Sequence, residues 1–155
     1  MLAMRYVLVA ALCGLLLGGC GGGDDDGEVP AGDVTKRQYI AEANRVCEEG
    51  DFSISQAAGT YFNKELGLKP NEAPSQEQVE TFAEEEAIPL IQDQIDALRE
   101  IEAPEADAGQ LTKIYDTAQD DLDAAKEDPA VLTRGQPFED TNRLAREYGL
   151  SACDD

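Results

Sequence analysis

The sequence contains no histidine and no tryptophan. Ser-His-Asp and Cys-His catalysis need histidine, as do H-E-x-x-H zinc sites and the Glu-x-x-His ligands of di-iron helical bundles. The G-x-x-x-x-G-K-S/T motif of a phosphate-binding loop is also missing. These absences exclude several common routes to hydrolysis, metal binding and nucleotide binding, and we expect no cofactor.

Basic residues are scarce, since 12 Lys and Arg stand against 33 Asp and Glu, a formal net charge of −21. Nucleic acids and anionic lipid headgroups are bound through basic patches, so we expect no nucleic-acid partner. The carboxylates occur partly in runs, at Glu84, Glu85 and Glu86 and at Asp120, Asp121 and Asp123. Consecutive helical residues point in different directions, which favours a solvated face over the paired carboxylates of a glycosidase. We therefore expect a protein that is not an enzyme.

Long apolar runs are missing except at the N-terminus, where residues 6–17 read YVLVAALCGLLL after Arg5. Such a run, rising ~1.5 Å per residue, is too short to cross a ~30 Å hydrocarbon core as a helix. A charged start followed by a short apolar segment is typical of a secretory signal peptide. We assign residues 1–19 to this signal.

The four residues 17–20, Leu-Gly-Gly-Cys, resemble the bacterial lipobox. By that resemblance Cys20 carries a diacylglycerol and is the first residue of the mature chain. Cys13 lies inside the signal, so Cys47 and Cys153 are left to pair. Outside the cytoplasm a disulfide between them is expected. Because it would close almost the whole domain into one loop, it is worth ~4–5 kcal/mol in the chain-entropy model.

Residues 20–33 contain several glycines and acidic residues and almost nothing apolar, which predicts a flexible acidic tether behind the lipidated cysteine. The signal contains one basic residue and no acidic one. The mature part therefore retains 11 basic and 33 acidic residues, a formal net charge of −22. Solubility explains this charge as well as cation binding does.

The remaining segment, residues 34–155, shows the three- and four-residue apolar spacing of amphipathic helices and no alternating strand pattern. A capping box formed by Thr35 and Gln38 predicts the start of the first helix. Gly50 is expected to weaken or bend this helix, which ends before Gly67. Its expected apolar stripe comprises Tyr39, Ile40, Ala43, Val46, Cys47, Ile54, Ala57, Ala58, Tyr61, Phe62 and Leu66.

A second capping box, Ser75 with Gln78, predicts the next helix. Pro89 lies inside its apolar pattern, where it removes a hydrogen bond and should kink the helix, with a break near Ala87 as the alternative. Its expected stripe comprises Val79, Phe82, Ala83, Ile88, Ile91, Ile95, Leu98 and Ile101.

A third helix is expected to open around Pro104 and to stop at the Glu-Asp-Pro sequence 127–129. Its core face comprises Leu111, Ile114, Tyr115, Ala118, Leu122 and Ala125. A last, short helix begins at Pro137 and ends at Gly149 in a Schellman motif. The expected fold class is all-α, a small helical bundle of three long helices, one kinked at Pro89, plus a short C-terminal helix, closed by one disulfide.

Three stretches carry a resemblance: YIAEANRVC (39–47), IQDQIDALREIEAP (91–104) and FEDTNRLAREYGLSAC (138–153). Together they resemble a group of short, uncharacterised lipoproteins of high-GC Gram-positive (actinobacterial) bacteria. The resemblance implies lipidation at Cys20 and pairing of Cys47 with Cys153. It implies no activity, so no catalytic residue is transferred.

These observations predict a lipid-anchored extracytoplasmic binding or interaction module of the bacterial cell envelope. The lipid on Cys20 would hold it at the outer face of the cell membrane, where its partner would be an envelope protein or a wall component. Two alternatives come from other functional classes. One is a carboxylate-dependent hydrolase of cell-wall glycans, and the other is a low-affinity divalent-cation binder.

Overall fold

The computed structural model describes residues 34–134 and 137–153, and these residues form helices and connections without a strand. The signal peptide (1–19), Cys20 and the tether (20–33) lie outside the described residues. The helical elements are α1 (Lys36–Gly59), η1 (Thr60–Glu65), α2 (Gln76–Phe82), η2 (Ala83–Ala87), α3 (Ile88–Glu100), η3 (Glu105–Asp107), α4 (Ala108–Glu127), α5 (Val131–Arg134) and α6 (Glu139–Tyr148). The expected bundle of three long helices and a short C-terminal one is confirmed, and α5 is an addition to it.

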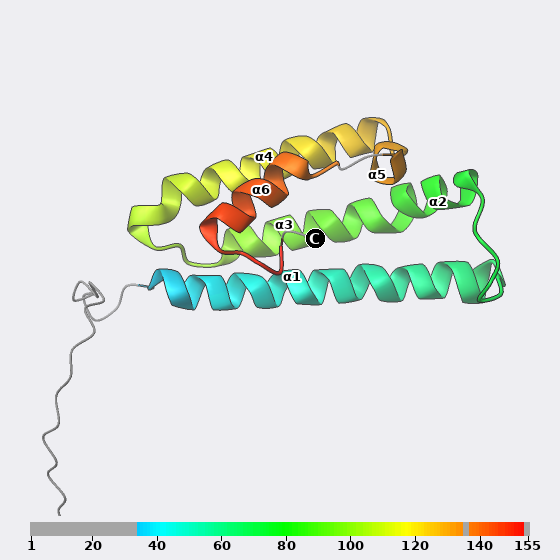
Figure 1. Ribbon diagram of the computed structural model, residues 1–155, viewed down its shortest axis with the longest axis horizontal. Helices are drawn as coiled ribbons and strands as arrows, with labels where there is room; N and C mark the ends of the chain where they lie inside the picture. The colour runs from blue at the N-terminus through cyan, green and yellow to red at the C-terminus, as the bar shows by residue number, and fades with distance from the viewer. Residues whose placement is uncertain (1–33, 135–136, 154–155) are drawn as a thin grey trace, which may run out of the picture.

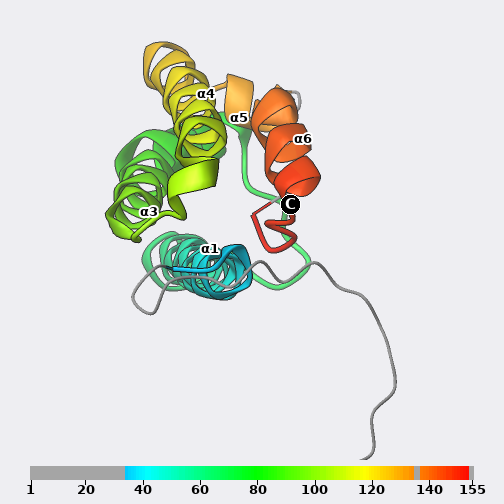
Figure 2. The ribbon, with the colours of Figure 1, turned by 90° about the vertical axis from the view of Figure 1, so that its left-hand side faces the viewer.

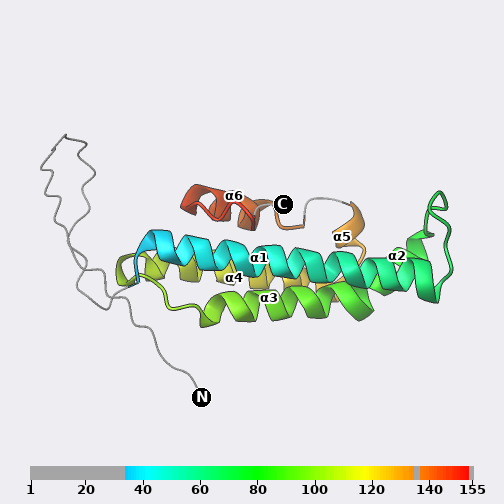
Figure 3. The same ribbon diagram turned by 90° about the horizontal axis from the view of Figure 1, so that it is seen from below.

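The three long helices lie side by side along the long axis of the molecule, and α6 packs on α4 (Figure 1). Seen from one end, α1, α3, α4 and α6 surround a common centre (Figure 2). Seen from below, α1 and α3 are neighbours along most of their length (Figure 3). Because α6 has 10 residues and α1 has 24, the fourth helix covers only part of the bundle. No helix among the described residues is long and apolar enough to cross a membrane.

Both predicted capping boxes are present. The Thr35 hydroxyl accepts a hydrogen bond from the Gln38 amide at 3.2 Å, and the Gln38 side chain accepts one from the Thr35 amide at 3.0 Å. Ser75 and Gln78 make the same pair of bonds at 3.2 and 2.8 Å. These bonds satisfy backbone donors that a helix start leaves without a partner, so the two helices begin where the sequence predicts.

The irregularity expected at Pro89 takes the form of a π-helical turn, η2, directly before it. The Ile88 amide donates to the Ala83 carbonyl, a bond that spans five residues instead of four. Pro89, which has no N–H to donate to the preceding turn, directly follows this wider turn at the start of α3. The helix therefore continues through this region from α2 into α3 without a break.

One other expectation at a helix position needs correction. Pro137 does not begin the last helix, because α6 starts two residues later, at Glu139. Its end is as predicted: Gly149 has φ 110°, and the Leu150 amide donates to the Ala145 carbonyl at 2.9 Å. Gly50 lies inside α1, which continues to Gly59.

The buried apolar residues form two clusters. The first, which we call the four-helix cluster, draws on α1, α3, α4, α6 and the segment after α6. It comprises Tyr39, Ala43, Cys47, Leu98, Leu111, Ile114, Tyr115, Leu144, Ala145, Tyr148 and Leu150. The second, the α3–α4 cluster, comprises Ile88, Ile95, Ala118, Leu122 and Ala125. All six core residues expected on α4 are buried.

Candidate functional site

The structure brings the two predicted disulfide cysteines together. Cys47 on α1 and Cys153 after α6 are joined by a disulfide, with their Cα atoms 5.2 Å apart across a sequence separation of 106 residues. The segment that carries Cys153 also bonds to α1, since the Ala152 amide donates to the Asn44 side-chain oxygen at 3.1 Å. Leu150 at its start is 1% exposed. The chain after α6 therefore closes the side of the bundle between α6 and α1.

An apolar cavity of about 190 Å³ lies beside this disulfide, and both half-cystines line it. Residues from both core clusters contribute to its wall, so the cavity lies where the two clusters meet. Its buried lining includes Ile95, Leu98, Ile114 and Ala118 from α3 and α4. Other lining residues are partly or fully exposed, among them Asp51, Asn142 and Ala152. We call these three residues, on α1, on α6 and after α6, the mouth of the cavity.

Two polar side chains at the cavity bond to other protein atoms. The Gln94 amide donates to the Cys47 carbonyl at 3.2 Å, and the Thr141 hydroxyl donates to the Asp121 carboxylate at 2.7 Å. A Cβ added at Gly50 would lie 2.5 Å from the Gln94 Cδ. Gly50 thus allows α3 to approach α1 so closely that Gln94 can reach the backbone beside the disulfide.

Tyr115 lines the cavity, and two further buried tyrosines, Tyr39 and Tyr148, lie with it in the four-helix cluster. The Tyr39 hydroxyl contacts that of Tyr115, and the Tyr148 hydroxyl donates to the Asp107 carboxylate at 2.8 Å. Burial raises the pKa of Tyr39 to about 12. Burial also raises the pKa of Tyr148, and the hydrogen bond to Asp107 adds to the effect. Both phenols are therefore protonated across the physiological pH range.

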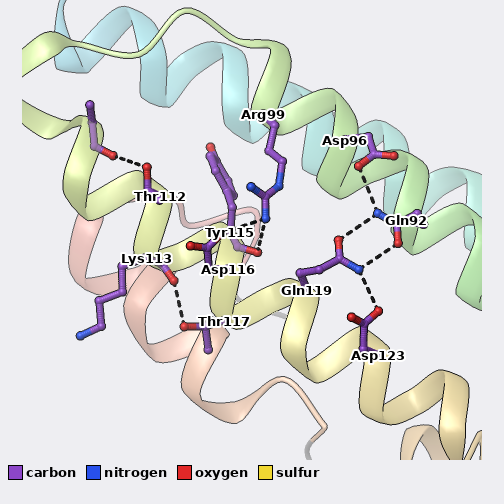
Figure 4. Close-up of polar contacts among 11 residues, drawn as sticks. Gln92, Asp96, Arg99, Thr112, Lys113, Tyr115, Asp116, Thr117, Gln119 and Asp123 are labelled. Atoms are coloured by element: carbon purple, nitrogen blue, oxygen red, sulfur yellow. Dashed lines mark hydrogen bonds and ion pairs between the residues drawn. The ribbon is translucent and has the colours of Figure 1, made fainter.

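A group of polar side chains, which we call the polar seam, joins α3 to α4 (Figure 4). The amides of Gln92 and Gln119 donate to each other's oxygens at 3.0 Å in both directions. Each glutamine also donates to the aspartate four residues further on, Gln92 to Asp96 at 3.1 Å and Gln119 to Asp123 at 3.0 Å. The seam fixes the register of the two helices that carry most of the buried cavity wall.

The sequence holds a signal for this seam. Gln-x-x-x-Asp occurs at 92–96 and again at 119–123. Four-residue spacing places both members on one helix face. The two faces meet only if α3 and α4 are each rotated about their own axes so that these faces point toward each other. The periodicity of a single helix does not specify this rotation.

The acidic runs lie elsewhere. Glu84, Glu85 and Glu86 are exposed on η2, and Asp120 and Asp123 are exposed on α4. Among the described residues, Asp51 is the one carboxylate of the cavity lining. Within the same part of the chain, no three His, Cys, Asp or Glu side chains are grouped so that they could hold a metal ion.

No family model matches this chain, and no curated protein or solved structure matches it either. The function is therefore argued from the residues themselves, with the disulfide and the adjacent cavity as the candidate site.

Proposed function

We propose that this protein is a lipid-anchored extracytoplasmic binding module of the bacterial cell envelope. In this proposal a lipid on Cys20 holds the chain at the outer face of the cell membrane, and residues 20–33 act as a tether. The helical domain then binds an envelope component. The observation that carries the proposal is the Cys47–Cys153 disulfide, which forms one wall of an apolar cavity.

The disulfide supports an extracytoplasmic address, because structural disulfides persist in oxidising compartments and are rare in the cytosol. It also supports the role given to Cys20. The sequence has four cysteines, one of them inside the signal, and the pair in the domain leaves Cys20 as the remaining thiol of the mature chain. That thiol directly follows the short apolar run and the lipobox-like residues.

The cavity supports a binding role. Ligand sites are concave and mostly apolar, with a few polar groups at defined positions. Here isoleucine, leucine and alanine side chains form the wall, and Asp51 and Asn142 stand at the mouth. The polar seam and the disulfide hold the surrounding helices in place, so the cavity is formed before any ligand arrives.

The anchor is tested by replacing one cysteine at a time in the expressing bacterium. We expect Cys20→Ser to abolish labelling by a radioactive fatty acid and to leave unprocessed precursor. Cys13→Ser is the matched control, because Cys13 belongs to the removed signal, and it should leave labelling unchanged. A Cys20→Ser protein that is still processed and labelled would contradict the proposal.

The binding role is tested by photo-crosslinking in the cell. A photoreactive residue at Asn142, at the mouth of the cavity, should give a discrete adduct. The same residue at Glu147, which is exposed on the same helix and does not line the cavity, should not give that adduct. Identical adducts from the two positions, or none from Asn142, would argue against binding at this site.

A further inference from the structure

We propose that the cavity beside the disulfide binds a small, uncharged, apolar molecule of about one or two rings, in the size range of benzene to indole. This inference rests on the proposed binding function and names the chemical class of its ligand. It is carried by the size of the cavity, by the side chains that line it, and by the charge around its mouth.

The first argument is size. Protein interiors are close-packed, and voids larger than a water molecule are few. An engineered apolar cavity of about 150 Å³ stays dry and binds benzene or xenon. The cavity of this protein, at about 190 Å³, is larger. It therefore has room for one aromatic ring or a compact fused pair.

The second argument is the chemistry of the wall. Four isoleucines from three different helices line the cavity, Ile54 on α1, Ile91 and Ile95 on α3, and Ile114 on α4. The polar groups of Gln94 and Thr141 already bond to Cys47 and Asp121. A ligand inside the cavity thus meets branched aliphatic carbon and the disulfide, and its affinity comes from removing apolar surface from water.

The third argument is charge. The lining contains one acidic side chain, Asp51, at the mouth, and the whole chain has a formal net charge of −21. An anion that enters an apolar cavity loses its hydration and gains no cationic partner from the lining. Carboxylates such as benzoate or a fatty acid are therefore disfavoured, and an uncharged ligand is preferred.

The fourth argument is access. Phe138, directly before α6, and Thr141 and Asn142 in the first turn of α6 are among the residues that line the cavity. Asn142 is half-buried there, and Asp51 across the mouth on α1 is exposed. The cavity lining thus reaches the solvent at Asp51, and we expect the ligand to enter on this side.

The test uses the mature lipidated chain in phosphatidylcholine nanodiscs, labelled at the isoleucine methyl groups for NMR. The chain has seven isoleucines, of which Ile54, Ile91, Ile95 and Ile114 line the cavity and Ile40, Ile88 and Ile101 do not. Titration with benzene or indole should shift the four lining methyls in a saturable way and leave the other three in place. Benzoate at the same concentration should shift none of them.

A filled cavity supplies the second arm. Ala118→Leu adds three carbons to a cavity-lining position, and Ala124→Leu makes the same change at an exposed position of α4. We expect the Ala118→Leu protein to lose the response to benzene at least tenfold and the Ala124→Leu protein to keep it. Unchanged Ile40 and Ile101 signals show that a variant is folded. If Ala118→Leu does not fold, Ala145→Val fills the opposite wall.

Three results would overturn the proposal. They are no shift up to the solubility of benzene and indole, equal shifts at all seven isoleucines, and a response that survives both filled variants. None of them bears on the labelling of Cys20. Failure of the ligand class is therefore distinguished from failure of the lipid anchor, which the Cys20→Ser experiment decides.

Discussion

The two halves of the bundle are built differently. In the half where α1 begins, buried residues of α1, α3, α4 and α6 meet in the four-helix cluster, and the disulfide closes the remaining side. In the other half the α3–α4 cluster contains no buried residue of α1 or α6. There α1 ends in a ring cluster in which Tyr61 and Phe62 pack on Phe82 at centroid distances of 5.6 and 5.1 Å. Phe52 and Leu66 are 64% and 38% exposed.

The difference follows from the length of α6. A helix of 10 residues rises about 15 Å, whereas the 24 residues of α1 rise about 36 Å, so the fourth helix covers only the first half. The cavity lies where the two clusters meet, and residues before, on and after α6 line it. The short fourth helix thus explains why the second half of the bundle has fewer buried neighbours.

The largest effect is expected from the disulfide, which belongs to the first half alone. Replacing both Cys47 and Cys153 by alanine should lower the free energy of unfolding of the mature chain by ~4–5 kcal/mol, because the unfolded chain regains the freedom of a very long loop. Chemical denaturation of the mature chain, compared with the unreduced parent, measures this loss. A change below ~1 kcal/mol would show that the first half is held by packing alone.

A matched pair of leucines on α4 compares the cores directly. Leu111 lies in the four-helix cluster and Leu122 in the α3–α4 cluster, with 2% and 0% exposure. Leu→Ala at either site should cost ~2–5 kcal/mol. We expect the larger loss at Leu111, because neighbours held by the disulfide relax less into the space left behind. Chemical denaturation measures both losses, and a larger loss of unfolding free energy for Leu122→Ala than for Leu111→Ala would contradict this expectation.

Alkaline pH should act on the first half through its tyrosines. Burial raises the pKa of Tyr39 to about 12 from its ordinary value of 10.0. The unfolded chain therefore loses this proton at lower pH than the folded one. The stabilisation is complete below pH ~10 and is lost as the pH rises towards ~12, at roughly 1 kcal/mol per pH unit for this residue.

Thermal unfolding at a series of pH values measures the slope. Tyr148, whose pKa is also raised, adds to the loss at the upper end of the range. Tyr39→Phe should make the slope shallower, while Tyr61→Phe, in the second half, is the control and should leave it unchanged. An equal slope in the parent and Tyr39→Phe proteins would refute the assignment.

The smallest effects are expected at the two capping boxes, one in each half. Thr35→Ala and Ser75→Ala each remove a bond to a backbone donor and should each cost ~1 kcal/mol. Amide hydrogen exchange should show faster exchange at Gln38 in the first variant and at Gln78 in the second. Protection that remains unchanged at these two amides would show that the caps contribute nothing to the helix starts.

Much of the fold could be predicted from the sequence, because it depends on local patterns. Periodicity along α4 identified every core residue from Leu111 to Ala125, and the Thr35 and Ser75 boxes identified two helix starts. The pairing of Cys47 with Cys153 followed from counting cysteines once Cys20 was set apart as the lipidated residue. Lipidation of Cys20 itself remains a prediction, because it lies outside the described residues.

The rest depends on how helices meet. The turn η2 does leave a local signal in the sequence. Two successive residues of the predicted apolar stripe, Ala83 and Ile88, are five residues apart, and the π-helical hydrogen bond found there has the same spacing. Gly50 was expected to weaken or bend α1, and the structure shows a further role that the sequence did not indicate, since Gly50 leaves room for Gln94 of the neighbouring helix. The cavity has no sequence signal at all, because it arises from how α1, α3, α4 and α6 meet, a tertiary relation.

The central claim is that one cysteine of the mature chain, Cys20, carries the lipid anchor, while Cys47 and Cys153 form the disulfide that stabilises the fold. Mass spectrometry of the protein isolated from membranes without reduction tests it in one measurement. We predict an N-terminal peptide that begins at Cys20 and carries a diacylglycerol thioether, together with a disulfide-linked peptide pair containing Cys47 and Cys153. An unmodified Cys20, or a disulfide between Cys20 and either of the other two, would contradict the claim.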